Sequence, residues 1–140
     1  MNPADVDLRV SLASVELEHP LVDASGTFDL LEVARRVRGD CIAEFAYAAY
    51  VPKTVTADAR DGNPPPRVTE TPSGMINAIG LENPGVEAFV GGLPALARLR
   101  QPVIVSVGGN EPEQYAAVVR RIEEALSTGH AELPRVAGYE

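Results

Sequence analysis

The sequence predicts an α/β protein with a parallel sheet, and two observations carry this prediction. Runs with the residue pattern of strands alternate along the chain with runs that have the period of helices. The 140 residues are 45% hydrophobic and 23% charged, which is ordinary for a globular domain that buries a core. Such alternation favours right-handed crossovers, in either a doubly wound sheet or a closed barrel.

The first quarter of the chain predicts a small hairpin, a strand and a helix. Residues 6–10 and 15–17 have the pattern of short strands with polar residues between them. Residues 21–26 begin apolar and run into small residues and a glycine, which is typical of a buried strand that ends in a tight loop. Asp29 is placed to cap a helix predicted over residues 30–38.

The middle of the chain combines one strand with a long irregular stretch. A strand is predicted within residues 48–55, although residues 41–50 are rich enough in alanine for a helical or mixed alternative. Residues 57–74 hold four of the twelve prolines and little periodicity. Such a stretch inside a compact domain is typical of a functional loop or lid, and the alternative is a linker between two domains.

The remainder returns to alternating helices and strands. A helix is predicted from Pro84, and two glycines and Pro94 break it into two pieces. Residues 103–107 form a largely β-branched run and are the strongest strand signal in the sequence. A helix over residues 111–126 follows, and residues 136–140 begin a further strand.

Charge, cysteine content and hydropathy exclude several classes of protein. Twelve basic against 20 acidic residues give a net charge of −8 and a pI near 4.7, so nucleic acids and acidic membrane surfaces would be repelled. No apolar run approaches the ~20 residues of a membrane helix, and the first residues lack a secretory pattern. Cys41 is the single cysteine, lies in an apolar context and favours a structural role in a reducing compartment. We expect a cytoplasmic protein.

The carboxyl ends of parallel strands lie at one edge of a sheet or barrel, where ligands bind. The predicted strand ends place Ser25, Lys53, Thr54 and Ser106 on that edge together with the long loop. Lys53 is the only lysine among twelve basic residues, which fits either a site that needs a compact ammonium group or chance placement on the surface. Hydroxyls and glycines at this edge would allow a flat or phosphorylated ligand to approach the backbone.

Asn77 is the one amide within an apolar segment, residues 73–81, that contains two glycines. Its side chain could bind a planar ligand that carries an amide or carboxylate, or it could satisfy backbone groups in an irregular turn. Neither the phosphate-binding P-loop nor the dinucleotide-binding glycine pattern is present. His19 and His130 are far apart in the sequence, so we expect no metal site.

Four stretches of the sequence together resemble the amino-terminal half of class 1 dihydroorotate dehydrogenases. They are HPLVDASGTF (19–28), VPKTVT (51–56), GNPPPRVTETPSGMINAIGLENPG (62–85) and PVIVSVGG (102–109). The resemblance covers residues 6–140 and implies the amino-terminal half of a (β/α)₈ TIM barrel, with a short hairpin before it. It also implies binding of FMN and oxidation of dihydroorotate to orotate in de novo pyrimidine biosynthesis.

The resemblance also implies which residues form the site. The flavin contacts would be Ala24, Ser25, Lys53, Thr54 and Ser106, although many relatives have an asparagine where this chain has Ser106. Lys53 would also touch the substrate and stabilise electron density on the reduced flavin, while hydride leaves C6 of dihydroorotate toward flavin N5. The orotate ring and carboxylate would be held by the segment Asn77, Ala78, Ile79, Gly80 and Leu81.

The resemblance further implies a chain that stops short of the catalytic base. The family motif Asn-x-Ser-Cys-Pro-Asn would follow Glu140, so we expect residues 1–140 to form a partial barrel without a catalytic residue and without turnover in isolation. Residues 62–85 resemble the subclass that passes electrons to NAD through an iron–sulfur/FAD subunit, rather than the fumarate-using homodimer. An oligomer is expected for the full-length enzyme. The alternative function is a non-catalytic fragment or interaction module without flavin.

Overall fold

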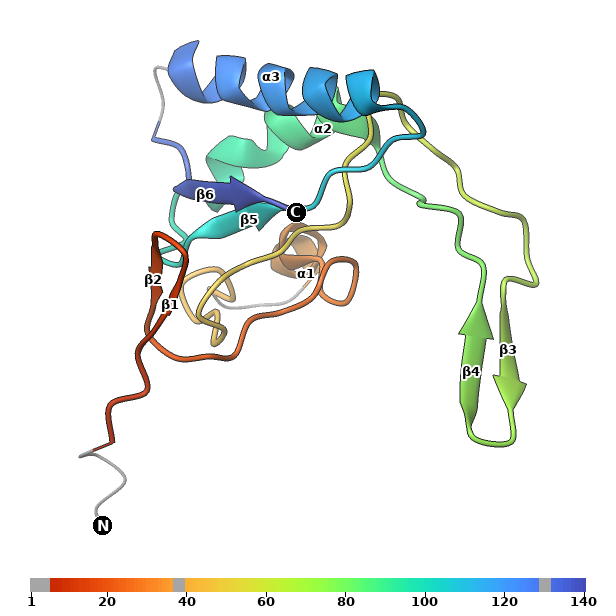
Figure 1. Ribbon diagram of the computed structural model, residues 1–140, viewed down its shortest axis with the longest axis horizontal. Coiled ribbons are helices and arrows are strands. Elements are labelled where there is room, and N and C mark those ends of the chain that lie inside the picture. The colour runs from red at the N-terminus through yellow and green to blue at the C-terminus, as the bar shows by residue number, and fades with distance from the viewer. Residues whose placement is uncertain (1–5, 37–39, 129–131) are drawn as a thin grey trace.

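In a computed structural model, residues 6–36, 40–128 and 132–140 are described. The elements, labelled in Figure 1 where there is room, are β1 (Val10–Leu12), β2 (Val15–Leu17), α1 (Leu30–Arg36), β3 (Val68–Thr71), β4 (Gly74–Asn77), α2 (Gly85–Gly92), the 3₁₀ helix η2 (Leu93–Leu96), β5 (Val103–Val105), α3 (Pro112–Thr128) and β6 (Val136–Tyr139). The predicted helices and the strands β5 and β6 are present, whereas the strands predicted over residues 21–26 and within residues 48–55 are not among these elements.

Strand β5 lies at the centre of the parallel layer. It pairs in parallel with β6, and the Val103 amide donates to the Arg135 carbonyl at 2.8 Å. The Ile104 amide instead donates to the Tyr50 carbonyl at 2.9 Å. Since successive amides of a strand point to opposite edges, residues 50–55 and β6 lie on opposite sides of β5.

The strand predicted within residues 48–55 runs beside β5 in parallel, but it is not a continuous strand. Only the isolated parallel bridges Tyr50↔Val103 and Val55↔Val107 connect the two segments. Between these bridges the chain carries Pro52, which has no amide hydrogen to donate to a ladder. The helical alternative for residues 41–50 is wrong, because this stretch forms turns and bends.

The strand predicted over residues 21–26 does not form, and a side chain takes the place of a backbone ladder. The segment lies next to residues 48–51, where the Ala48 amide donates to the Leu21 carbonyl at 2.9 Å. Further along, the Val51 amide donates to Asp23 Oδ1 at 2.6 Å instead of to a carbonyl. The backbone then turns, with Gly26 at φ +75°.

The main core lies between the parallel layer and the helices. In Figure 1, α2 and α3 lie together on one side of β5 and β6. Val118 and Ile122 of α3 have no exposed surface and belong to one cluster with Val103 and Val105 of β5. Cys41 is half-buried and packs against this cluster, in line with a structural role.

The opposite face of the parallel layer is covered by the amino-terminal hairpin. Val15 and Leu17 of β2 form a second cluster with Ala48 and Ala49, and Ile104 packs against it. Because Ile104 alternates with Val103 and Val105, this second cluster lies on the other side of β5. The hairpin itself is predicted correctly, but its first strand is β1, Val10–Leu12, rather than residues 6–10.

The predicted helices form with small differences at their ends. Asp29 caps α1 as expected, since its Oδ1 accepts the Glu32 amide hydrogen at 2.9 Å. The end of this predicted helix, residues 37–38, lies outside the described residues. Helix α2 ends at Gly92 and η2 begins at Leu93, and α3 extends to Thr128.

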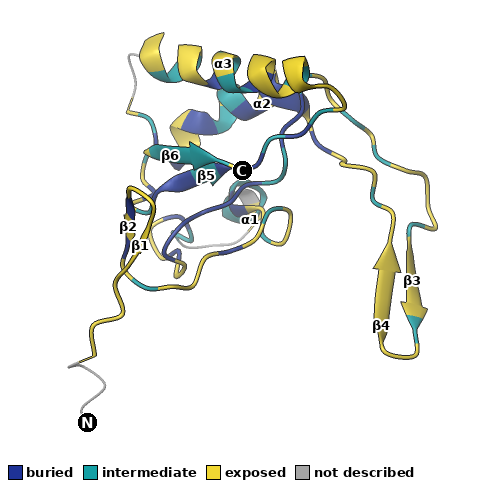
Figure 2. Cartoon of the chain, viewed as in Figure 1, coloured by how far each residue is buried: buried dark blue, intermediate teal, exposed yellow. Residues whose placement is uncertain are grey.

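The long proline-containing stretch, for which the sequence predicts a functional loop or lid, belongs to a two-stranded ribbon. The ribbon spans residues 60–83: Arg60 and Asn83 pair at its base, and β3 and β4 pair antiparallel toward its tip. It projects from the body in Figure 1 and is mostly exposed in Figure 2. Residues 64–66 are three prolines, which have no amide hydrogens. The periodicity of the sequence therefore does not predict a ribbon here.

We predict opposite effects of the same substitution at two glycines of α2. Gly85 has φ +82°, and a Cβ there would lie 2.8 Å from the Ala59 backbone nitrogen, whereas a Cβ on Gly91 would meet nothing within 4 Å. Gly85→Ala should lower the free energy of unfolding by roughly 1–2 kcal/mol or more. Gly91→Ala should raise it by up to ~1 kcal/mol, because alanine favours the helix. Urea titrations of both variants test this, and equal shifts of one sign would contradict the backbone geometry.

We also predict a pH-dependent effect of Asp23→Asn. Asp23 is buried, its Oδ2 has no hydrogen-bond partner within the described structure, and burial raises the pKa of its carboxyl. A folded-state pKa above the unfolded value means that this group's stabilisation, full at low pH, is lost as the pH rises through the folded-state pKa. The unfolding free energy of Asp23→Asn, relative to the parent chain, should therefore increase between pH 4 and pH 7. Parallel pH profiles for the two proteins would contradict it.

Candidate functional site

An open cavity of about 940 Å³ lies where the carboxyl ends of the parallel segments meet the base of the ribbon. It collects all the residues that the sequence assigned to a site except Ala24: Ser25, Lys53, Thr54, Asn77, Ala78, Ile79, Gly80, Leu81 and Ser106. Ala24 is exposed beside it, and its carbonyl accepts the amide and hydroxyl hydrogens of Thr27 at 3.0 and 2.6 Å. Residues that are distant in sequence therefore share one cavity.

A chain of three hydroxyls crosses the floor of this cavity. Thr54 Oγ1 lies 3.0 Å from Ser25 Oγ on one side and 3.0 Å from Ser106 Oγ on the other. Ser25 also donates to the Pro52 carbonyl at 3.1 Å. Since each hydroxyl has one proton, Thr54 must then donate to Ser25, and Ser106 to Thr54. The chain leaves Ser106 with free lone pairs, so that it can accept a hydrogen bond from a ligand.

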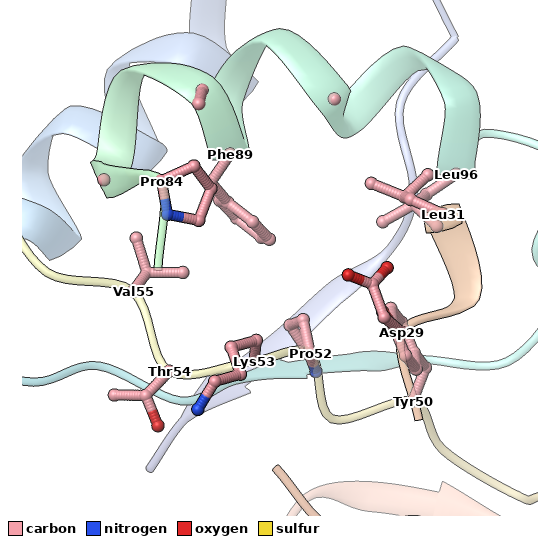
Figure 3. A pocket seen from close by; sticks show the side chains of 13 residues that line it. Asp29, Leu31, Tyr50, Pro52, Lys53, Thr54, Val55, Pro84, Phe89 and Leu96 are labelled. Carbon is pink, nitrogen blue, oxygen red and sulfur yellow. The ribbon is translucent and has the colours of Figure 1, made fainter. Parts of the chain in front are cut away.

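Lys53 places its ammonium group over Gly26. A Cβ on Gly26, which has φ +75°, would approach Lys53 Nζ to 3.2 Å, so glycine leaves the space that the lysine occupies. Lys53 is half-buried, and no carboxylate in the described part of the chain forms an ion pair with it. In Figure 3 its nitrogen points away from the Asp29 carboxylate. A charge without a protein partner is available to an anionic or electron-rich ligand.

The segment from Asn77 to Leu81 forms the ribbon wall of the cavity. Ala78 and Ile79 are held to the opposite side of the ribbon, because the Ala78 amide donates to the Arg67 carbonyl at 2.9 Å and the Ile79 carbonyl accepts the Asn63 amide at 2.9 Å. Asn77 is exposed and ends β4, and no hydrogen bond of its side chain amide occurs within the described structure. The interpretation of Asn77 as a buried turn residue is therefore wrong.

A second cavity of about 270 Å³ lies behind Lys53, between the segment 50–55 and helices α1 and α2 (Figure 3). Its lining is mostly apolar and includes Leu31, Pro52 and Phe89. Tyr50 contributes a hydroxyl that accepts the Leu30 amide hydrogen at 3.3 Å, and burial raises the pKa of this phenol. Of the three residues in the hydroxyl chain, only Thr54 lines this second cavity.

Two other findings concern metals and membranes. Within the described ranges, no three His, Cys, Asp or Glu side chains gather closely enough to hold a metal ion. His130 lies outside those ranges. No helix among the described elements has the length and hydrophobicity needed to cross a bilayer.

Sequence reasoning missed two buried side chains next to the site, Asp23 and Asn83. Asp23 stands directly before Ala24 and was counted as part of a strand. Asn83 precedes a proline and a glycine, a setting that favours side-chain bonds to nearby backbone amides. The sequence around Asn83 therefore carries a local signal for such a role. It carries no signal for the hydrogen-bond partners of Asn83 that lie within residues 54–56.

Comparison with known proteins agrees with the fold. The structure of a dihydroorotate dehydrogenase from Eimeria tenella in complex with ferulenol matches 89% of this chain and 36% of that one, with a TM-score of 0.66 and 18% identity. This likeness concerns the fold, and it supports the prediction of a partial TIM barrel.

Three bacterial relatives share more sequence, and each is named as the catalytic subunit of an NAD(+)-type dihydroorotate dehydrogenase B. The protein of Pelobacter propionicus is 42% identical over 135 residues, covering 96% of this chain and 40% of its own length. Those of Desulforudis audaxviator and Latilactobacillus sakei are 45% and 44% identical, over 84% and 91% of this chain and 38% and 41% of their own. The chain thus spans about 40% of the length of these relatives. The family model for dihydroorotate dehydrogenase matches residues 7–131, and the chain belongs to the dihydroorotate dehydrogenase family.

Proposed function

We propose that this chain supplies the flavin- and substrate-facing amino-terminal part of an enzyme that oxidises dihydroorotate to orotate in pyrimidine biosynthesis. One observation carries the proposal: Lys53, the hydroxyl chain and the segment from Asn77 to Leu81 converge on one cavity. Within this proposal, residues 1–140 are one part of a single barrel domain.

The residues of the cavity fit FMN. An isoalloxazine ring has a flat apolar body and a polar edge with both hydrogen-bond donors and acceptors. The cavity offers the Lys53 ammonium group as a donor and the lone pairs of Ser106 as acceptors. Gly26 and Gly108 leave space at the strand ends that a side chain would fill. A Cβ on Gly108, for example, would lie 2.9 Å from Thr54 Cγ2. We assign Ala24, Ser25, Lys53, Thr54 and Ser106 to the flavin side.

Bound FMN would supply the hydride acceptor. Lys53 would stabilise the negative charge that accumulates near its ammonium group during the reaction, because no carboxylate in the described structure neutralises it. Asn77 can orient an orotate-like ring by donating to its carbonyl or carboxylate oxygens and accepting from its ring N–H. The backbone of Ala78, Ile79, Gly80 and Leu81 would complete the substrate wall. The proton-abstracting base would come from beyond Glu140.

The proposal also includes a partner and a compartment. The relatives are named catalytic subunits of NAD(+)-type enzymes, which supports a separate electron-transfer subunit for this protein. The iron–sulfur and FAD centres proposed for that subunit rest on the family resemblance of residues 62–85. An oligomer of the complete enzyme follows from such an assembly. The single cysteine supports a cytoplasmic location.

Titration of the 140-residue chain with FMN tests the proposal. Quenching of FMN fluorescence that saturates at one equivalent, with flavin absorbance retained after desalting, is the expected result. Orotate added to the FMN complex should then perturb the flavin absorbance. A monodisperse chain that retains no flavin would overturn the proposal and would support the alternative, a non-catalytic fragment or interaction module.

Lys53→Arg should impair flavin reduction in an enzyme that joins this chain to the rest of the barrel. The forked guanidinium is bulkier than the ammonium group that fits over Gly26, so its charge would be displaced. Stopped-flow absorbance with dihydroorotate should show reduction slowed roughly tenfold or more, a barrier increase of about 1.4 kcal/mol. Arg98→Lys, at an exposed ion pair with Asp40, is the matched control and should reduce normally. Normal reduction in Lys53→Arg would refute this role of the lysine.

A further inference from the structure

Asn83 is the most highly connected side chain beside the cavity. It is buried, with 7% of its surface exposed, and its Oδ1 accepts hydrogen bonds from the Gly85 amide at 2.9 Å and from the Thr56 amide at 3.2 Å. Its Nδ2 donates to Thr56 Oγ1 at 2.9 Å and to the Leu81 carbonyl at 2.7 Å. One amide thus joins the end of the segment 50–56, the start of α2 and the end of the ribbon.

The bond to Leu81 restrains a backbone conformation that leucine rarely adopts. Leu81 has φ +54°, and Gly80 before it has φ +83°. A left-handed conformation costs a residue with a Cβ about 1–2 kcal/mol, so it persists only where neighbouring contacts hold it. The contact from Asn83 Nδ2 to the Leu81 carbonyl is such a restraint. Without it, the chain from Asn77 to Leu81 loses a fixed direction toward the cavity.

The other bonds of Asn83 make the restraint specific to the site. Thr56 follows Lys53 and Thr54 in the chain, and its hydroxyl donates to the Asp58 carbonyl at 2.6 Å while it accepts from Asn83. The Asn83 backbone also exchanges two hydrogen bonds with Arg60, at 2.8 and 3.0 Å. The ribbon wall is therefore tied to the strand end that carries Lys53 at its base.

We infer that Asn83 is a positioning residue that holds the substrate-facing segment, residues 77–81, against the strand end that carries Lys53 and Thr54. The inference rests on the proposed function for its ligand. Asn83 acts through both ends of its amide: Nδ2 donates to the Leu81 carbonyl, and Oδ1 accepts from the Thr56 and Gly85 amides. Asn83 lies outside the lining of the main cavity, so we assign it no direct contact with flavin or substrate.

Asn83→Asp tests the inference because it keeps the shape and the acceptor oxygen and removes the two Nδ2 donors. The matched control is Asn110→Asp, the same chemical change at an exposed residue whose Oδ1 accepts from Arg60 Nη2 at 3.4 Å. Amide hydrogen exchange is measured on both variants of the 140-residue chain. Asn83→Asp should speed exchange of the paired Ala78 amide at least tenfold and leave the amides of β5 within twofold of the parent. Uniformly faster exchange, or no change at Ala78, would overturn the inference.

The ligand measurement separates this inference from the proposed function. In the FMN complex, Asn83→Asp should weaken orotate binding at least tenfold and change FMN affinity by less than threefold, while Asn110→Asp changes neither. Equal loss of both ligands would mark Asn83 as merely structural and overturn the inference, and unchanged orotate affinity would also overturn it. If the parent chain binds neither ligand, the proposed function fails, and the exchange rate of the Ala78 amide still decides whether Asn83 holds the segment.

Discussion

The parallel alignment of the chain on both sides of β5 is the constraint on which the site depends. The amides of Ile104 and Gly108 donate to the segment 50–55, and those of Val103 and Val107 donate to the segment that includes β6. This register places Thr54 level with Ser106, and the contact of Asp23 with Val51 places Ser25 level with Thr54. Three hydroxyls from distant parts of the sequence meet because backbone hydrogen bonds fix the height of each strand end.

The ribbon forms the wall of the cavity beside the floor of three hydroxyls. A two-stranded ribbon that projects into solvent is only marginally stable by itself, since its ladder buries little apolar surface. Here its exposed strands β3 and β4 are anchored at the base by the buried amide of Asn83 and at mid-length by Asn63, whose Nδ2 donates to the Ala78 carbonyl at 2.8 Å. The segment from Asn77 to Leu81 contains or adjoins the backbone groups that both anchors bind. Side-chain amides thus fix the wall, because few apolar contacts do so.

The polar side chains around the cavity differ in the free energy that their burial costs. The Asp23 carboxyl is buried and has one oxygen without a partner in the described structure, which is unfavourable for its charged form. Asn83, in contrast, uses both ends of its amide.

The parallel layer is also open, since β6 and the segment 21–23 form its edges. A strand edge has free amides and carbonyls that can pair with further strands, which agrees with a chain that spans about 40% of its relatives' length.

The sequence by itself determined the class of fold, the order of the helices and the identity of the residues at the strand ends. Helix α3 and strand β5 were predictable because their periodicity is local and strong, and the motifs around Ser25, Lys53 and Asn77 carried the family resemblance. Only the tertiary structure decided that residues 60–83 pair as a ribbon, that Asp23 replaces a ladder bond, and that Asn83 joins three segments. The bonds of Asp23 to Val51 and of Asn83 to Thr56 join residues 28 and 27 positions apart, and the base of the ribbon depends on the distant pair Arg60 and Asn83. Neither propensity nor spacing is sensitive to such distant partners.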